Sequence, residues 1–125
     1  MNFQEGHALE TYKSMIAISV EGYKALLLIN GGAIVATLAY LEQSSTGSET
    51  AKHMLWPLYG FVAGIVFIVI AFMFSYAAQF KLFNESVNSQ PKGRHMCCVW
   101  AALFSVILSL IFFSFGSILS VRAIS

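Results

Sequence analysis

The stretch ALLLINGGAIVATLAYL, residues 25–41, decides how this chain folds. In a soluble protein, Asn30-Gly31-Gly32 between apolar runs would predict a tight β-hairpin, because asparagine and glycine tolerate positive φ. In a bilayer, no water satisfies exposed backbone groups, so a hairpin there would leave several donors and acceptors unpaired. Each arm of the hairpin would also be too short to span the membrane. We therefore predict that the stretch is helical and that its glycines are packing residues.

The composition favours a lipid environment. The chain has 125 residues, of which 58% are apolar and 10% are charged, whereas about a quarter of the residues of a soluble domain are charged. The six acidic residues are all glutamates, and they lie outside the long apolar runs. A net charge of +1 does not suggest a nucleic-acid or polyanion partner. We expect a single membrane domain over residues 1–125, surrounded by the lipid bilayer.

Three apolar segments predict membrane-spanning helices at about residues 24–42, 54–80 and 96–121, because a helix needs about 20 residues to cross the bilayer. Before them, residues 7–23 carry apolar side chains at helical spacing, which predicts an N-terminal amphipathic helix. The sequence leaves open whether this helix continues into the first span. The predicted fold is all-α, an integral membrane three-helix bundle preceded by the amphipathic helix. The apolar face of that helix consists of Leu9, Tyr12, Ile16, Val20 and Tyr23.

Basic residues predict the orientation, since cytoplasmic loops carry an excess of lysine and arginine. Lys13, Lys24, Lys81, Lys92 and Arg94 fall on one side of the spans, against Lys52 and Arg122 on the other. We therefore expect a cytoplasmic N-terminus, a C-terminus outside, and a bacterial inner membrane as the location. Tyrosine and tryptophan near the span ends predict aromatic belts. One belt comprises Tyr40, Trp56 and Tyr59, and the other comprises Tyr23, Tyr76 and Trp100.

Pro57 lies near the start of the second span, where a missing amide hydrogen would cost no helical hydrogen bond. The longest polar connection is expected between Asn84 and His95. Small residues recur on each span, including a GxxxG pattern in the second. In lipid, helices associate through close contact at such residues. We favour packing within one protomer for any single stripe, with homo-oligomerisation as the alternative. The predicted helix-packing interface comprises Gly32, Ala36, Gly60, Gly64, Ala71, Ser75 and Gly116.

A second pattern is an intramembrane polar face. Asn30 is the strongly polar side chain well inside a span, and Thr37 shares its helix face seven residues later. Ser105 and Ser109 on the third span complete the predicted face. These four residues would either line a polar conduit or form an interhelical hydrogen bond worth about 1 kcal/mol. We favour the hydrogen bond, because a buried amide needs a partner.

The sequence offers no catalytic constellation. His7, His53 and His95 lie outside the spans and not all on one side, so one chain is not expected to hold haem or a metal ion between them. Cys97 and Cys98 are adjacent, which points their side chains about 100° apart on a helix and favours ordinary packing. We expect neither an enzyme nor a cofactor. The spans also lack the ionisable residues typical of proton relays.

Two functions remain. The first is a homo-oligomeric membrane protein whose helices form a pore or perturb the bilayer. A single three-helix protomer is too thin to enclose a channel, so this function needs several copies. Holin-like proteins and small effectors of bacterial antiviral defence offer a fold-level analogy only. The alternative is a non-catalytic accessory subunit that stabilises a larger membrane complex, and a third, weaker possibility is a sensor. We favour the homo-oligomer.

Overall fold

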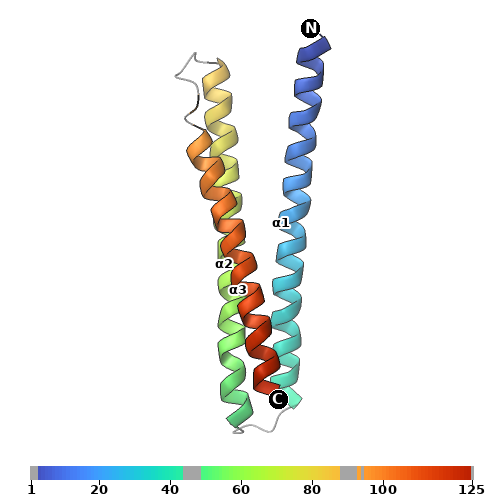
Figure 1. Cartoon of the computed structure of the whole chain (residues 1–125), viewed down its shortest axis with the longest axis vertical. Coiled ribbons are helices and arrows are strands. Elements are labelled where there is room, and N and C mark those ends of the chain that lie inside the picture. Colours follow the sequence, from blue (N-terminus) through green and yellow to red (C-terminus); the bar gives the residue numbers. More distant parts are fainter. Residues whose placement is uncertain (1–2, 44–48, 88–92, 94, 125) are drawn as a thin grey trace.

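The computed structural model describes residues 3–43, 49–87, 93 and 95–124. Within these residues the chain forms three α-helices, α1 (Phe3–Gln43), α2 (Glu49–Val87) and α3 (Met96–Ile124) (Figure 1). Each contains a segment long and apolar enough to cross a membrane. This confirms the all-α, three-span prediction and is consistent with an integral membrane protein. Residues 44–48, Lys92, Arg94 and Ser125 lie outside the described residues.

All three helices are longer than the predicted spans. At a rise of about 1.5 Å per residue, α1 (41 residues), α2 (39) and α3 (29) measure about 60, 58 and 43 Å. A hydrocarbon core is about 30 Å thick, so the helices tilt within it or extend beyond it. Residues 7–23 continue into the first span as one helix, which answers the question that the sequence leaves open.

The expectation for Pro57 is wrong. α2 begins at Glu49, so Pro57 lies inside the helix and not in its first turn. Proline has no amide hydrogen, so the carbonyl of His53 receives no bond from it.

The polar residues before the apolar segment extend the helix, and the ion pair between Lys52 and Glu49 (2.8 Å) adds a small favourable contact there. The structure also ends α2 at Val87, beyond the predicted start of the polar connection.

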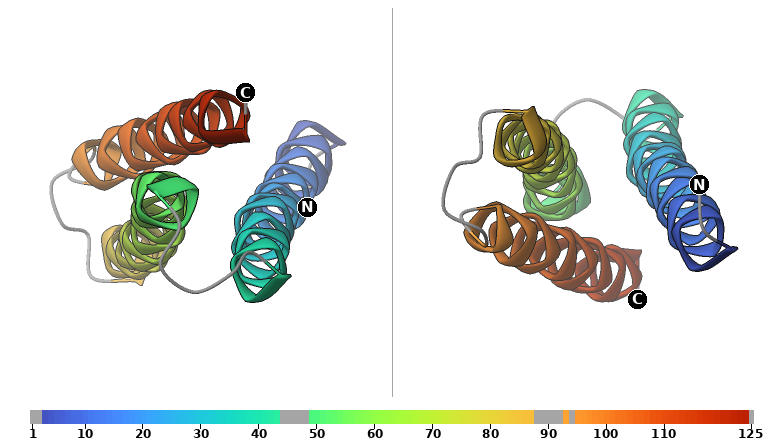
Figure 2. Two further views of the ribbon diagram at one scale, coloured as in Figure 1. Left: turned by 90° about the horizontal axis from the view of Figure 1, so that it is seen from below. Right: turned by 90° about the horizontal axis from the view of Figure 1, so that it is seen from above.

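The helices do not pack equally against one another. α2 contacts α3 along most of their common length, α1 contacts mainly α2, and α1 meets α3 at very few positions. Figures 1 and 2 show the N-terminal half of α1 standing away from the other two helices. The first residues of α1 lie at the same end of the molecule as the end of α2 and the start of α3, and the last residues of α3 lie near the end of α1 (Figure 1).

The core between the helices is narrow, and large apolar side chains face outward along all three helices. Apolar side chains suit a surface that faces lipid, because hydrocarbon has no water to form hydrogen bonds with polar groups. Two aromatic contacts join α2 to α3. The rings of Phe67 and Phe112 stack with centroids 5.3 Å apart, and those of Phe61 and Phe113 lie 5.8 Å apart. The buried hydrophobic residues are Leu26, Met54, Phe61, Ile68, Ala71, Ala78, Cys98 and Ala102.

Candidate functional site

One close contact between α1 and α2 pairs a buried amide with a glycine. Asn30 is 0% exposed, and its Nδ2 donates a hydrogen bond to the Leu26 carbonyl at 3.0 Å. Its Oδ1 has no hydrogen-bond partner and occupies the space that a side chain at residue 64 would need. A Cβ built on Gly64 would lie 2.9 Å from Asn30 Cγ, closer than Cβ contacts normally come. The absence of a side chain at Gly64 therefore lets the amide enter the α1–α2 contact.

The structure buries all four residues of the predicted polar face, Asn30, Thr37, Ser105 and Ser109. The Thr37 hydroxyl donates to the Ala33 carbonyl at 2.7 Å, and the Ser105 hydroxyl donates to the Ala101 carbonyl at 2.9 Å. These bonds stay within the residue's own helix. Ser109 Oγ is fully buried without a partner. The described bonds of the four residues therefore do not link α1 to α3.

Two glycines bring the backbones of α2 and α3 together. A Cβ added at Gly60 would lie 3.3 Å from both the Gly116 Cα and the Phe112 carbonyl oxygen. A Cβ added at Gly116 would lie 2.9 Å from the Phe61 ring. Ala71, also in the predicted packing interface, is 0% exposed. These residues pack inside one protomer.

The remaining residues of the predicted packing interface lie elsewhere. Ser75 of α2 forms a hydrogen bond with the hydroxyl of Tyr23 on α1 (2.5 Å), and Tyr23 also meets the ring of Phe72 edge-on at 6.3 Å. Tyr23 thus turns inward, whereas the sequence suggests an interfacial belt. Gly32 and Ala36 lie on the outward face of α1, and nothing lies within 4 Å of a Cβ added at Gly32.

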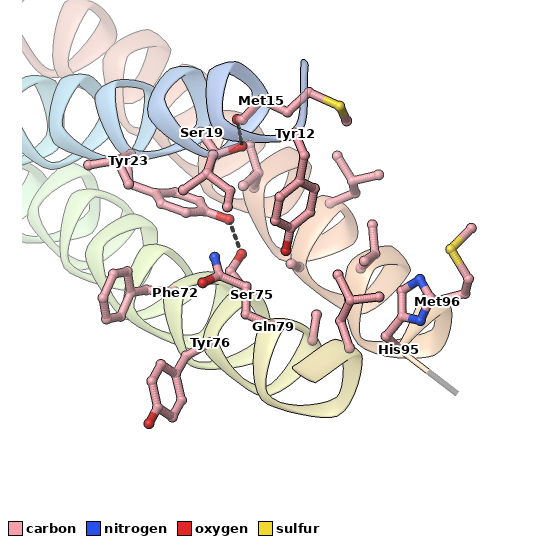
Figure 3. Close-up of a pocket in the computed structure, with 18 residues that line it drawn as sticks. Tyr12, Met15, Ser19, Tyr23, Phe72, Ser75, Tyr76, Gln79, His95 and Met96 are labelled. Carbon is pink, nitrogen blue, oxygen red and sulfur yellow. Dashed lines mark hydrogen bonds between the residues drawn. The ribbon is translucent and has the colours of Figure 1, made fainter. Parts of the chain in front are cut away.

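Where α1 stands away from its neighbours, the three helices line an open groove (Figure 3). The groove has a volume of about 570 Å³, and its lining is mainly apolar. Tyr12 and Tyr23 point from α1 towards α2, and Ser75 and Gln79 point from α2 into the groove. The sequence indicates the α1 wall through the spacing of Tyr12, Ile16, Val20 and Tyr23, but it does not indicate a groove. The rest of the lining comes from α2, from His95 just before α3, and from α3: Phe72, Ser75, Tyr76, Ala78, Gln79, Leu82, His95, Met96, Val99, Ala102, Leu103 and Val106.

The two cysteines differ in environment. Cys97 is exposed, whereas Cys98 is buried and its Sγ lies 3.2 Å from Lys81 Nζ. Among the described residues, no three histidine, cysteine or acidic side chains lie close enough together to hold a metal ion.

No protein-family model, curated protein or solved structure matches this chain. Three features of its helices bear on function: the Asn30–Gly64 contact inside the protomer, the outward small residues of α1, and the apolar groove.

Proposed function

We propose that the chain is a small homo-oligomeric protein of a bacterial inner membrane, with a cytoplasmic N-terminus, whose assembled helices form a pore or perturb the bilayer. The observation that carries this proposal is the outward face of α1. Ala25, Gly32, Ala36 and Ala39 share that face, and all four are exposed. In lipid, a face of small side chains favours close approach of another helix, because van der Waals contact between backbones supplies the attraction.

The contacts that α1 makes inside the protomer leave this face uncovered. Leu26, Asn30 and Thr37 are buried on the side of α1 that meets α2. Each residue turns the helix by about 100°, so Gly32 points roughly opposite to Asn30. α1 therefore has one face for its own protomer and a second face of small residues that a neighbouring copy can contact.

The burial of the four polar residues limits how such an oligomer would act. Asn30, Thr37, Ser105 and Ser109 are buried inside the protomer, so they would not line a path between copies. A path for water or ions would run between apolar outer faces of several copies, or through lipid that the copies distort. Apolar constrictions of this kind gate by dewetting and discriminate weakly between ions.

The first test is native mass spectrometry of the protein extracted gently from its own membrane. We expect a closed assembly with one copy number, which Gly32→Leu and Ala36→Leu reduce to smaller species. Gly22→Leu is the matched control, because Gly22 is also an exposed α1 glycine with nothing within 4 Å of an added Cβ. Liposome flux should fall with the two assembly variants and persist with the control.

A single copy in every preparation would contradict the proposal. Co-extraction with a larger protein at a fixed stoichiometry would also overturn it. The chain would then be an accessory subunit that packs against that protein, and the Gly32 and Ala36 variants should release it.

A further inference from the structure

We infer that the chain thins the bilayer beside α1, because the Glu21–Lys24 ion pair draws water and lipid headgroups towards the membrane centre on that side. The pair is joined at 2.8 Å, and both side chains are largely exposed (71% and 63%). Each residue turns a helix by about 100°, so Glu21 points opposite to Asn30, which is buried against α2. The ion pair therefore lies on the outward face of α1, where charged groups need water or headgroups around them.

This ion pair makes the uncharged stretch of α1 much shorter than those of the other helices. The stretch has 17 residues on α1 (25–41), 28 on α2 (53–80) and 26 on α3 (96–121). At about 1.5 Å per residue, these measure about 26, 42 and 39 Å. A hydrocarbon core is about 30 Å thick, so the stretch on α1 is shorter than the core and the other two are longer.

A hydrogen bond fixes the height of α1 against α2. The hydroxyls of Tyr23 and Ser75 are bonded, so these two residues lie at about the same height in the bundle. On α1 the charged Lys24 lies directly beside this bond, whereas α2 remains uncharged for five more residues beyond Ser75. A flat boundary between hydrocarbon and headgroups would therefore either bury the ion pair or place the exposed rings of Tyr76 and Phe80 in water.

The start of α3 repeats this difference. Cys98 lies at the height of Lys81, because its Sγ is 3.2 Å from Lys81 Nζ, and on either side of it Met96 and Trp100 are exposed. Deforming lipid by a few ångströms has a modest cost. Burying charges in hydrocarbon, or exposing several large apolar side chains to water, costs more. The boundary therefore follows the side chains, high beside α2 and α3 and low beside α1.

The groove lets water and headgroups reach the inner side of α1 at the same height. Its deep end is the bonded pair of Tyr23 and Ser75, and it opens towards the start of α1 (Figure 3). Ser19 and Gln79 place further polar groups in its lining just beyond that bond. Polar surroundings thus extend to the depth of Lys24 on both sides of α1. The proposed perturbation of the bilayer, on which this inference rests, then takes place beside α1.

The test measures the depth of two side chains at one height of the bundle. Ile18 of α1 and Phe80 of α2 each lie five residues beyond the hydrogen bond that joins these helices, and both are exposed (69% and 57%). Each is replaced by tryptophan in a chain that carries Trp56→Phe and Trp100→Phe. In phosphatidylcholine vesicles, quenching by iodide on both sides of the membrane is compared with quenching by lipids brominated in the acyl chain.

Iodide should quench the Ile18→Trp protein several-fold more strongly than the Phe80→Trp protein, and the brominated lipids should give the reverse order. Adding Glu21→Leu and Lys24→Leu should bring Ile18→Trp to the level of Phe80→Trp. The uncharged stretch of α1 would then have 28 residues (14–41), the same number as in α2.

The ion pair between Glu49 and Lys52 provides the matched control. It has the same spacing and the same 2.8 Å distance, and it is also exposed, but it lies in the first turns of α2. Adding Glu49→Leu and Lys52→Leu should leave the quenching of both tryptophan proteins unchanged.

Equal iodide quenching of the Ile18→Trp and Phe80→Trp proteins would overturn the inference, because the boundary would then be flat. Quenching of Ile18→Trp that Glu21→Leu and Lys24→Leu do not change would overturn it too. Native mass spectrometry measures the copy number separately. A single copy with the expected depths would therefore contradict the proposed assembly and support the thinning beside α1.

Discussion

The two halves of the α1–α2 contact differ in the size of the side chains that form them. In one half, Asn30 enters the space left by Gly64 and the helices come close enough to bury the amide completely. In the other half, large side chains such as Tyr12 and Phe72 face a groove of about 570 Å³. The boundary between the halves is the hydrogen bond between the hydroxyls of Tyr23 and Ser75. The close half of the contact thus has a glycine on α2, and the open half has large side chains on both helices.

The largest expected effect comes from Gly60, where α2 packs against α3 and not against α1. A Cβ there would already lie 3.3 Å from backbone atoms of α3, and the rest of a leucine has no space. Gly60→Leu should force α2 and α3 apart and lower the free energy of unfolding by about 3 kcal/mol, the upper end for overpacking. Unfolding in SDS, followed by tryptophan fluorescence, measures the change. Gly22→Leu on the exposed face of α1 is the control and should shift the midpoint little.

A smaller effect is expected where the amide meets the glycine. Gly64→Ala should cost about 1–3 kcal/mol, because the new Cβ takes the place of the Asn30 amide. Asn30→Ala in the same chain should recover most of that loss, since it removes the atoms that collide. The double-mutant cycle in SDS measures this coupling. Additive losses would show that the amide does not occupy the Gly64 space.

The sequence predicts the helices of this chain well because their cause is local. Backbone groups in lipid must be paired within the segment, so the stretch around Asn30-Gly31-Gly32 is helical even though the same letters form a turn in water. The helix ends are predicted less well. Polar residues such as Glu49 and Lys52 extend α2 beyond its apolar segment, and composition does not show how far a helix continues outside the bilayer.

The candidate site depends on relations that a helix pattern does not contain. The sequence places Asn30 and Gly64 on separate predicted faces, one polar and one of small residues. Their pairing follows from the rotation and register of α1 against α2, which the pattern of either helix alone does not fix. The groove depends on the same quantities. The spacing of Tyr12, Ile16, Val20 and Tyr23 indicates an apolar face, but several different neighbours could cover such a face.

The hydrogen bond at the boundary is the next test of the comparison. Tyr23→Phe keeps the ring against Phe72 and removes only the hydroxyl that meets Ser75. Side-chain hydrogen bonds between membrane helices average about 0.6 kcal/mol, so a cycle with Ser75→Ala should give a coupling of that size. SDS unfolding provides the measurement. Zero coupling would mean that the ring contact alone marks the boundary.

The smallest effect should come from the open half and should have the opposite sign. Gly22 is exposed on α1, and nothing lies within 4 Å of a Cβ added there. Gly22→Ala therefore gains helix propensity without a collision, and it should raise the free energy of unfolding by about 0.5 kcal/mol. The same substitution at Gly64 should lower it. Since both glycines lie in helix interiors, opposite signs in SDS unfolding would come from neighbour contact alone. A loss at Gly22 would mean that another helix, from a second copy or a partner, covers this part of α1.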